Sequence, residues 1–407
     1  MTDRIHDFSA KLRQPAVADA VESYVRWQRE SDRARLSGSA APTPPGDGPI
    51  SINLDLTTAC NYRCDHCVDW DILSSQHRHR EDALRTSITT LVERGLRSVI
   101  LIGGGEPTLY PGFTPFVGFL KDSGLDVAVV TNGSRGDRLL EIADRLAERD
   151  WVRLSLDAGR DSTFRALHKP VRKDLDLGEI LAWIPRIKSS NARFRIGYSF
   201  VIVWRGAERD GIPLVDNIDE IELAAERARR AGFDYIAYKP ILERAENGAE
   251  VMSPDSMAGC ARTAVERIRR GIERAQRHSG DGFDVHVSTN LRVLDQGNWR
   301  DFTVQPKRCH MQAFRQVLSP DGLWNCPAHR GVEKARLGSR DAYAGVAAAT
   351  ATGLRLARSI GNFDASRECR QVTCLYNSVN WWLEKRVNEP GDAAESDVDA
   401  EPLDFSL

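Results

Sequence analysis

Short apolar runs alternate along the chain with longer amphipathic segments. The runs have the length and composition of buried strands, and the segments between them place apolar residues every three to four positions, which indicates helices. Strand-like runs cover residues 50–56, 97–102, 125–131, 151–157, 194–203 and 234–239, and helical patterns lie near 81–95, 111–123, 136–149, 175–189 and 217–232. Strands that alternate with helices predict repeated βα units and a parallel sheet. Right-handed crossovers would curl that sheet into a barrel or partial barrel, with its chemistry at the C-terminal ends of the strands.

The segments outside this alternation have different patterns. Apolar residues recur at helical spacing within 1–36, and the Pro-, Gly- and Ser-rich stretch that follows predicts a linker. A basic amphipathic helix is expected at roughly 256–277, and the last twenty residues, with seven acidic residues and no basic one, predict a disordered tail. We therefore divide the chain into an N-terminal helix and linker (1–49), an α/β barrel (50–245), a connecting helical segment (246–299), a cysteine-rich extension (300–386) and an acidic tail (387–407).

Composition and charge narrow the class of protein. Of the 407 residues, 41% are hydrophobic and 28% are charged, which is typical of a globular chain. The net charge of -2 gives no electrostatic reason to expect nucleic acid or an anionic membrane as a partner. The chain has no apolar run long enough to span a membrane, and its polar first residues do not resemble a secretory signal. We therefore expect a cytoplasmic protein.

The first group of cysteines has the spacing of metal ligands. Disulfides are rare in cytoplasmic proteins, so the eight cysteines favour metal ligation. Cys60, Cys64 and Cys67 lie in CNYRCDHC, with the spacing C-x3-C-x2-C, directly after the first predicted strand. Three thiolates on one loop can ligate three irons of a cubane cluster and leave the fourth iron open to a substrate or cofactor. The alternative is a zinc knuckle in which His66 supplies the fourth ligand.

This motif resembles that of the radical S-adenosylmethionine (SAM) superfamily, and the resemblance extends over roughly residues 50–245. In that family the open iron chelates the amino and carboxylate groups of SAM. The run Gly103-Gly104-Gly105-Glu106-Pro107 follows the second predicted strand and resembles the family's GGEP motif, which contacts the SAM amino group. Glycines allow close approach of the backbone to a ligand, and a carboxylate can pair with an ammonium group. The resemblance implies SAM contacts from His66, Gly104, Gly105, Glu106, Ser155 and Asn217.

Three of the residues around the predicted site have alternative interpretations. Asn217 precedes a predicted helix, so it could be a helix N-cap and not a SAM contact. Asp157 lies in LSLDA at the end of the fourth predicted strand, where relatives often face the substrate, but it could also be a solvent-exposed loop carboxylate. Cys260 stands alone in the predicted helix 256–277. It is either a small buried side chain or, as in some radical SAM epimerases, a hydrogen-atom donor to a substrate radical.

A second group of cysteines lies near the C-terminus: Cys309, Cys326, Cys369 and Cys374. The segment LSPDGLWNC predicts a β-hairpin, so that the cysteines before it and at its end can face one metal. The group resembles the auxiliary-cluster extension of radical SAM enzymes called twitch, a short form of SPASM, which implies a second [4Fe–4S] cluster that relays electrons. The spacings depart from the common pattern, so His310 or Cys260 could replace a ligand. A structural zinc site is the alternative.

The whole pattern predicts a partial (β/α)6 radical SAM barrel that binds SAM and two [4Fe–4S] clusters and receives electrons from a flavodoxin- or ferredoxin-type donor. With one auxiliary site, the chain resembles the aminocyclitol dehydrogenases and diol dehydratases of aminoglycoside antibiotic biosynthesis. That resemblance implies hydrogen abstraction from a polyhydroxylated, amine-bearing small molecule and its dehydrogenation. Asp69 and Asp71, next to the first cysteine loop, could pair with such a cation or simply face solvent. Radical diol dehydration, epimerisation and modification of a ribosomal peptide are the alternative reactions.

Overall fold

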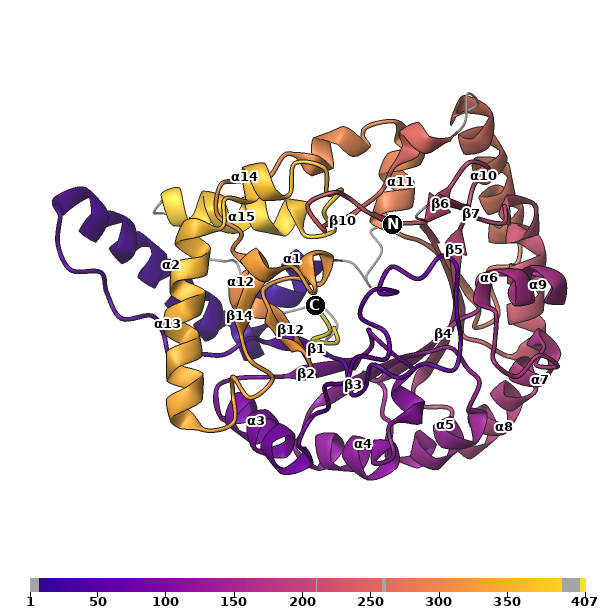
Figure 1. The fold of residues 1–407 in the computed structure, drawn as a ribbon, viewed down its shortest axis with the longest axis horizontal. Coiled ribbons are helices and arrows are strands. Elements are labelled where there is room, and N and C mark those ends of the chain that lie inside the picture. Colours follow the sequence, from indigo (N-terminus) through magenta and orange to yellow (C-terminus); the bar gives the residue numbers. More distant parts are fainter. Residues whose placement is uncertain (1–6, 210, 258–260, 390–402) are drawn as a thin grey trace.

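The computed structural model describes residues 7–209, 211–257, 261–389 and 403–407 (Figure 1). Its central element is a sheet of parallel strands, in the order β11-β8-β5-β4-β3-β2-β1. All six predicted strands are confirmed, and β11 is a seventh that the sequence did not reveal. The strands are β1 (Ser51–Leu54), β2 (Ser98–Leu101), β3 (Asp126–Thr131), β4 (Trp151–Ser155), β5 (Arg195–Ile202), β8 (Tyr235–Pro240) and β11 (Asp284–Val287).

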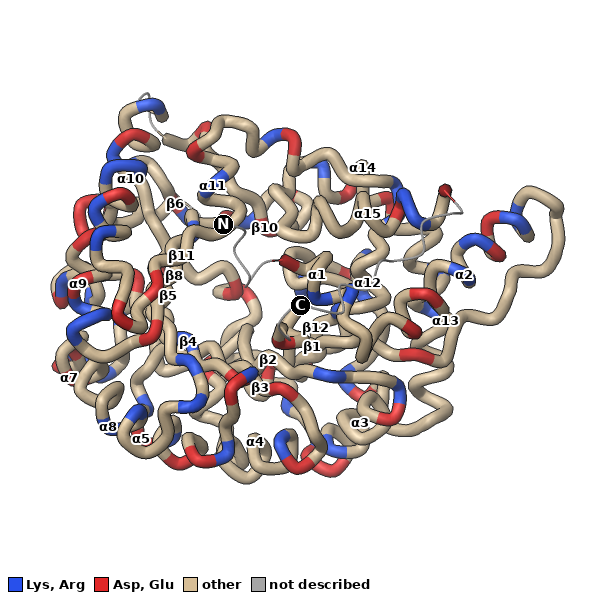
Figure 2. The backbone as a smooth tube through the Cα atoms, turned by 180° about the vertical axis from the view of Figure 1, so that it is seen from behind, with Lys and Arg blue, Asp and Glu red and all other residues tan. Residues whose placement is uncertain are grey.

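Helices cover the outer face of this curved sheet, so the fold is the predicted α/β partial barrel (Figure 1). Each helix turns its apolar side inward; in α4, for example, Phe113, Phe116 and Leu120 are fully buried. Acidic and basic residues are interspersed along the outer helices (Figure 2). The covering helices are α3 (Glu81–Glu93), α4 (Phe113–Asp122), α5 (Gly136–Ile142), α6 (Asp161–His168), α7 (Leu177–Leu181), α8 (Trp183–Ser190), α9 (Ile221–Ala231), α10 (Ala261–Gln276) and α11 (Thr289–Gln296).

The cysteine-rich segment continues the same sheet. Strand β12 (Arg315–Ser319) pairs in parallel with β1, and the predicted hairpin is confirmed because β13 (Gly322–Trp324) returns antiparallel to β12. Strand β14 (Arg336–Gly338) completes this edge. The barrel and the cysteine-rich segment therefore share one ten-stranded sheet. The helices of this segment are α12 (Met311–Phe314), α13 (Val346–Asn362), α14 (Ala365–Glu368) and α15 (Asn377–Asn388).

Smaller elements complete the described part of the chain. The N-terminal helical prediction is confirmed as α1 (Phe8–Arg13) and α2 (Pro15–Ser37), and α2 packs against α15. Two short hairpins lie beyond β5 and β8: β6 (Glu208–Arg209) with β7 (Ile212–Pro213), and β9 (Glu243–Arg244) with β10 (Glu250–Val251). Among the described helices, none is long and apolar enough to cross a membrane.

The prediction of a disordered acidic tail (387–407) is wrong for its first two residues, which belong to α15, and for its last five. Phe405 and Leu407 are buried in the same cluster of side chains as Phe8 of α1. Lys11 donates hydrogen bonds to Asp404 (3.0 Å) and to the backbone carbonyl of Ser406 (2.8 Å). Burial of these apolar side chains outweighs the acidic composition on which the prediction rested. Residues 390–402 lie outside the described residues.

Candidate functional site

The first three cysteines share the loop between β1 and α3. Burial raises the pKa of the Cys67 thiol to about 12 and that of Cys64 well above its usual range, and Cys67 and Cys60 raise the pKa of Cys64 further. These effects indicate that the three thiols lie in the same region of the loop. Tyr62, which is buried, anchors the loop through a hydrogen bond from its hydroxyl to the Asn132 carbonyl (3.3 Å). Three adjacent thiols on one loop fit a cluster with three protein ligands.

The glycine-rich loop after β2 lies directly against this cysteine loop. The amide of Glu106 donates to the Ala59 carbonyl (2.8 Å). A Cβ atom on Gly105 would lie 2.5 Å from the carbonyl oxygens of both Thr57 and Ala59, so only glycine permits this approach. Gly104 donates its amide to the Asp55 carboxylate (3.2 Å). The structure therefore brings the two predicted SAM-site motifs into contact.

Glu106 is held by the ends of β2 and β3. Its buried carboxylate accepts hydrogen bonds from the Thr108 hydroxyl (2.6 Å) and amide (3.1 Å), the Thr131 hydroxyl (2.6 Å) and the Asn132 amide (2.7 Å). Burial raises the pKa of Glu106, although these donors oppose the rise. The donors fix the carboxylate at the strand ends. The pairing of Glu106 with the SAM amino group stays a prediction.

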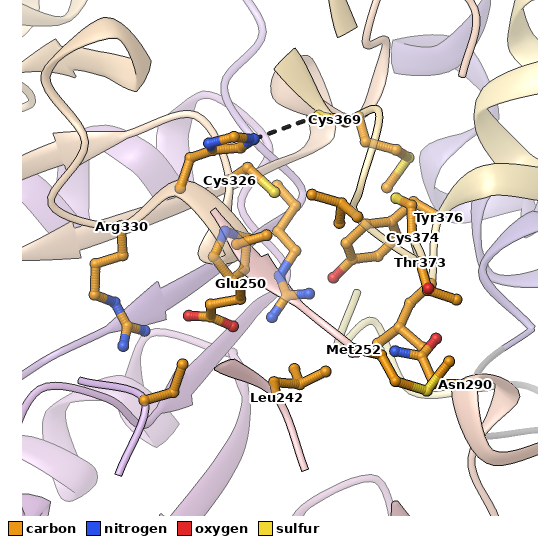
Figure 3. Close-up of a pocket in the computed structure, with 18 of the residues that line it drawn as sticks. Leu242, Glu250, Met252, Asn290, Cys326, Arg330, Cys369, Thr373, Cys374 and Tyr376 are labelled. Carbon is orange, nitrogen blue, oxygen red and sulfur yellow. Dashed lines mark hydrogen bonds between the residues drawn. The ribbon is translucent and has the colours of Figure 1, made fainter. Parts of the chain in front are cut away.

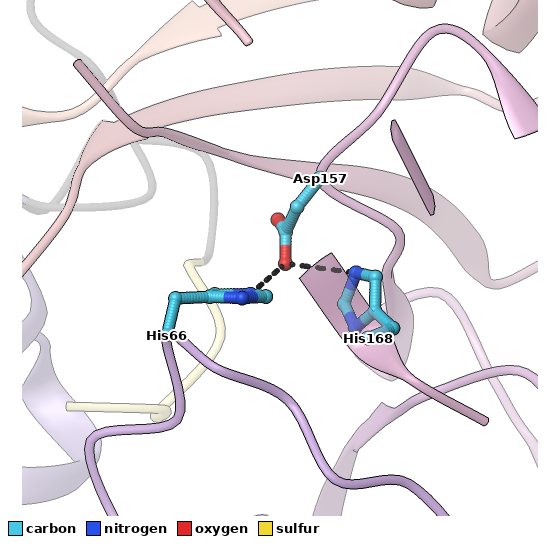
Figure 4. Close-up of side chains that lie close together, drawn as sticks. All are labelled: His66, Asp157 and His168. Carbon is cyan, nitrogen blue, oxygen red and sulfur yellow. Dashed lines mark hydrogen bonds and ion pairs between the residues drawn. The ribbon is translucent and has the colours of Figure 1, made fainter. Parts of the chain in front are cut away.

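Asp157 is buried between two histidines (Figure 4). Its carboxylate lies 3.0 Å from His66 Nε2 and 3.4 Å from His168 Nε2, and it accepts the Val201 amide (2.7 Å). Although burial alone would raise it, the pKa of Asp157 is held well below its usual range by hydrogen bonds from His168 and His66. The alternative of a solvent-exposed carboxylate is therefore wrong. A catalytic role for Asp157 stays a prediction.

His168 connects this group to the first cysteine loop. Its Nδ1 lies 3.2 Å from the Cys64 sulfur, and its Nε2 lies 3.0 Å from the carbonyl oxygen of Leu156. Sequence reasoning missed His168 because the polar helix α6, which ends at this residue, was not predicted. Hydrogen bonds to a ligand sulfur orient the ligand and influence the properties of a bound cluster.

Ser155 and Asn217 lie differently around the strand ends. Ser155 is half-buried at the end of β4, where the resemblance placed it. The buried Asn217 side chain donates to the carbonyls of Asp157 (2.8 Å) and Val201 (2.8 Å) and accepts the Val203 amide (2.8 Å). It does not cap the following helix. Both amide hydrogens are used, so its predicted contact with SAM finds no free donor.

A cavity of about 370 Å³ lies between the inner face of the barrel and the cysteine-rich segment (Figure 3). Strand residues from β1, β4, β8 and β11, with Ile102 just after β2, form one side of it. Glu250, from β10, also lines the cavity. Among the described residues its side chain has no hydrogen bond or close ion pair, although Arg330, Arg244 and Lys239 are near enough to lower its pKa. The opposite side is lined by the second group of cysteines: Cys309, Cys326, Cys369 and Cys374.

The four C-terminal cysteines line one region of this cavity. Burial raises the pKa of Cys369 well above its usual range, and the thiols of Cys309, Cys326 and Cys374 raise it further. Four thiolates are the donor set of a closed iron–sulfur cluster or of a structural zinc ion. His329, which the sequence analysis did not single out, has its Nε2 3.4 Å from the Cys369 sulfur.

The two proposed substitute ligands have different outcomes. His310 is fully engaged, because its Nδ1 lies 2.8 Å from the Tyr24 hydroxyl and its Nε2 lies 2.6 Å from Glu384. The alternative in which His310 replaces a cysteine is therefore wrong. Cys260 lies outside the described residues, so both of its predicted roles stay predictions.

Two acidic residues beside the first cysteine loop are already paired with arginines. Asp69 accepts a hydrogen bond from Arg330 (2.6 Å), and Asp71 lies 3.7 Å from Arg244. Both alternatives are therefore contradicted for Asp69, which is buried and paired, whereas Asp71 is exposed and its pairing with a cationic substrate stays a prediction. Arg330 also lies 3.5 Å from Asp55, the buried acid that holds Gly104. Sequence reasoning missed Asp55, although an acid at the end of an apolar strand was an available signal.

Comparisons with known proteins agree with this geometry. Residues 54–210 match the family model described as the Radical SAM superfamily. The chain is 36% identical over 112 residues to an S-adenosylmethionine-dependent nucleotide dehydratase of a Thermoplasmatales archaeon, which is 26% of this chain and 38% of that protein. It is 38% identical over 117 residues to the mycofactocin maturase MftC of Mycobacterium tuberculosis, which is 27% of this chain and 28% of that protein. The chain thus spans well under half the length of either relative.

A solved structure shows the same fold. Streptococcus suis SuiB bound to S-adenosylmethionine aligns with a TM-score of 0.50 at 13% identity, over 73% of this chain and 62% of that chain. At this identity the likeness concerns the fold alone.

Proposed function

Because residues 54–210 match the Radical SAM superfamily model, we propose that this protein cleaves SAM reductively and abstracts a hydrogen atom from a small substrate. A [4Fe–4S] cluster bound to Cys60, Cys64 and Cys67 would supply the electron that releases methionine and the 5'-deoxyadenosyl radical. A flavodoxin- or ferredoxin-type protein is the proposed electron donor. The contact between the cysteine loop and the glycine-rich loop supports a SAM site at this end of the barrel.

One observation carries the proposal: a single cavity adjoins the barrel strands on one side and four cysteines on the other. Its volume of about 370 Å³ lies in the range of small-molecule sites. We propose that Cys309, Cys326, Cys369 and Cys374 hold a second [4Fe–4S] cluster. A substrate radical formed in the cavity would then lie beside a one-electron acceptor, which favours net oxidation.

Glu250 is the proposed proton acceptor and amine partner for this substrate. Its carboxylate points into the cavity (Figure 3). Burial raises the pKa of Glu250 to about 7, and Asp69 raises it as well. A carboxylate with such a pKa can take the proton of a hydroxyl group near neutral pH. We propose a polyhydroxylated, amine-bearing substrate that is dehydrogenated at a carbon bearing a hydroxyl group.

The test is a screen of amino sugars and related polyols with the anaerobically reconstituted protein. We expect a substrate to increase the release of 5'-deoxyadenosine and to lose two hydrogen atoms by mass analysis. Loss of one water would indicate dehydration, and an unchanged mass with deuterium gained from solvent would indicate epimerisation. Absence of 5'-deoxyadenosine from protein with a full iron content would refute the radical reaction itself.

Modification of a ribosomal peptide is the second candidate function. The match to the mycofactocin maturase favours it, because that protein is named as a maturase. A short precursor peptide that binds tightly and triggers SAM cleavage, where amino sugars do not, would establish this function in place of the first.

A further inference from the structure

Three basic side chains line the cavity without an acidic partner. They are Arg153 from β4, Lys239 from β8 and Arg315 from β12. Within the described ranges of the chain, none of the three forms an ion pair with a carboxylate. The Nε atoms of Arg153 and Arg315 are buried and have no hydrogen-bond partner. Arg330, which lines the same cavity, is paired with both Asp55 and Asp69.

An unpaired buried cation is costly. Burial removes the solvation of the charge, and in folded proteins the loss is normally offset by a counter-ion. The effect is visible in the titration of two of these groups. Burial lowers the pKa of Lys239 to about 8, with a further lowering by Arg153, and burial lowers the pKa of Arg315 to about 10. Glu250, in the same cavity, and Asp157 oppose the lowering of the pKa for Lys239, and Glu250 opposes it for Arg315, but no carboxylate of the described residues lies within ion-pair distance of the three cations. The three cations therefore form a region that is more positive than the nearby carboxylates can balance.

Arg315 has other interaction partners that partly explain its position in the cavity. It donates to the Asn53 side chain (2.7 Å), stacks over the Tyr376 ring at 5.3 Å, and is close enough to Cys326 to sense its charge. It can therefore also serve the second cysteine site. In the described part of the chain, neither Arg153 nor Lys239 has a side-chain hydrogen bond or a close ion pair; Arg153 lies over the Trp151 ring at 5.2 Å, and Lys239 senses Asp157 and Glu250 from a longer distance. They carry the inference.

We propose that the substrate carries an anionic group, a phosphate or a carboxylate, that binds in the cavity between Arg153, Lys239 and Arg315. This inference rests on the proposed function for the identification of the ligand as the substrate. Guanidinium groups bind phosphate and carboxylate oxygens with two parallel hydrogen bonds, and a lysine adds a point charge. An anion anchored on β4 and β8 would leave the rest of a small molecule to extend toward Glu250 and the four cysteines.

The anion has a second possible source, because SAM itself has a carboxylate. The experiment therefore uses reconstituted protein saturated with SAM, with inorganic phosphate and acetate as probes. Thermal unfolding and calorimetry are measured for the wild type, Arg153→Met, Arg153→Lys and Lys239→Met. The matched control is Arg330→Met, which removes an arginine of the same cavity that has acidic partners.

We expect phosphate or acetate to raise the unfolding temperature of the wild type and to bind about tenfold or more weakly to Arg153→Met and Lys239→Met, because each variant loses a charge-assisted hydrogen bond. Stronger binding of phosphate than of acetate would identify a phosphate group, and the reverse order would identify a carboxylate. Arg153→Lys should retain part of the binding. Without a probe, Arg153→Met should unfold at the same temperature as the wild type or higher, whereas Arg330→Met should unfold at a lower one.

Three results would overturn the proposal. One is failure of both probes to bind, and another is an Arg153→Met protein as destabilised as Arg330→Met. The third is an equal loss of SAM affinity in Arg153→Met, which would assign the cations to the SAM carboxylate. These readouts do not depend on turnover. SAM cleavage without anion binding rejects this site alone, and anion binding without SAM cleavage rejects the proposed function alone.

Discussion

Replacement of Arg330 by methionine tests how the cysteine-rich segment is joined to the barrel. The Arg330 side chain is buried, and it lies 2.6 Å from Asp69 and 3.5 Å from Asp55. Asp55 in turn holds the Gly104 amide of the glycine-rich loop. Even with the arginine present, burial raises the pKa of Asp55 to about 7. Methionine keeps much of the volume of the side chain but leaves this carboxylate without a counter-charge.

The expected loss of stability depends on which acidic residue loses its counter-charge. Removing one partner of a buried ion pair costs about 3–5 kcal/mol. Asp69 keeps Arg244 at 3.5 Å, whereas Asp55 loses the one ion-pair partner it has among the described residues. We therefore expect the lower end, about 3 kcal/mol at pH 8. In equilibrium unfolding by urea this loss lowers the midpoint of the transition. In a thermal scan it lowers the unfolding temperature by roughly 3–4 °C.

The direction in which the free energy of unfolding changes with pH distinguishes the loss of an ion pair from a packing defect. The pKa of Asp55 is higher in the folded state than its usual value of 3.8, so the folded state keeps the proton to higher pH. The free energy of unfolding should therefore fall as the pH rises from about 4 to 7. Arg330→Met should steepen this fall, and Asp55→Asn in the same chain should restore stability at pH 8. A loss below about 1 kcal/mol, or no rescue by Asp55→Asn, would refute the ion-pair reasoning.

Three further outcomes are expected. Replacing Cys60, Cys64 and Cys67 together with alanine should abolish formation of 5'-deoxyadenosine and leave about four irons per chain by iron analysis; loss of all iron would contradict two separate sites. Cys326→Ala should lower both iron content and solubility, because cluster binding contributes to folding. Recovery of zinc instead of iron in the reconstituted wild type would rule out an electron acceptor there. Although burial opposes it, hydrogen bonds from a histidine and an arginine lower the pKa of Glu384 to about 2. The contribution of Glu384 to the stability of the folded protein is therefore present above its usual pKa of 4.5 and is lost as the pH falls toward 2. Glu384→Gln should remove this loss in urea unfolding of the metal-free protein at pH 3 to 6, and an unchanged pH profile would contradict the assignment.

The parts of the fold that the sequence predicted are those with a local pattern. The six strand-like runs and the hairpin before Cys326 have clear apolar periods or turn residues, and the structure confirms them. Strand β11 was missed because DVHV has only two apolar residues in four. The last five residues were misjudged because acidic composition was counted over the whole tail, while the burial of Phe405 and Leu407 depends on contacts with the N-terminal helices.

The residues of the candidate site can likewise be separated into those with a local sequence motif, which were predicted, and those without one. The cysteine spacing and the glycine-rich run are local signals, and they marked both loops. Asp55 had a local signal at the end of an apolar strand, but the roles of His168 and Arg330 were not predictable, because each matters through a contact with a residue far away in the sequence. Local sequence patterns gave the poorest predictions for single residues that belong to no motif. Asn217 neither caps a helix nor keeps a free donor, and its amide instead ties β5 to the end of β4.

The pairing of β1 with β12 has a consequence for the synthesis of the protein. The two strands lie side by side in the sheet, but roughly 260 residues separate them along the chain. At about 5–20 residues per second, the ribosome completes β12 tens of seconds after β1 has emerged. Throughout that interval the β1 edge lacks its final neighbour, and a strand with an open edge readily pairs with other chains. A cell that makes this protein must shield that edge until the cysteine-rich segment arrives.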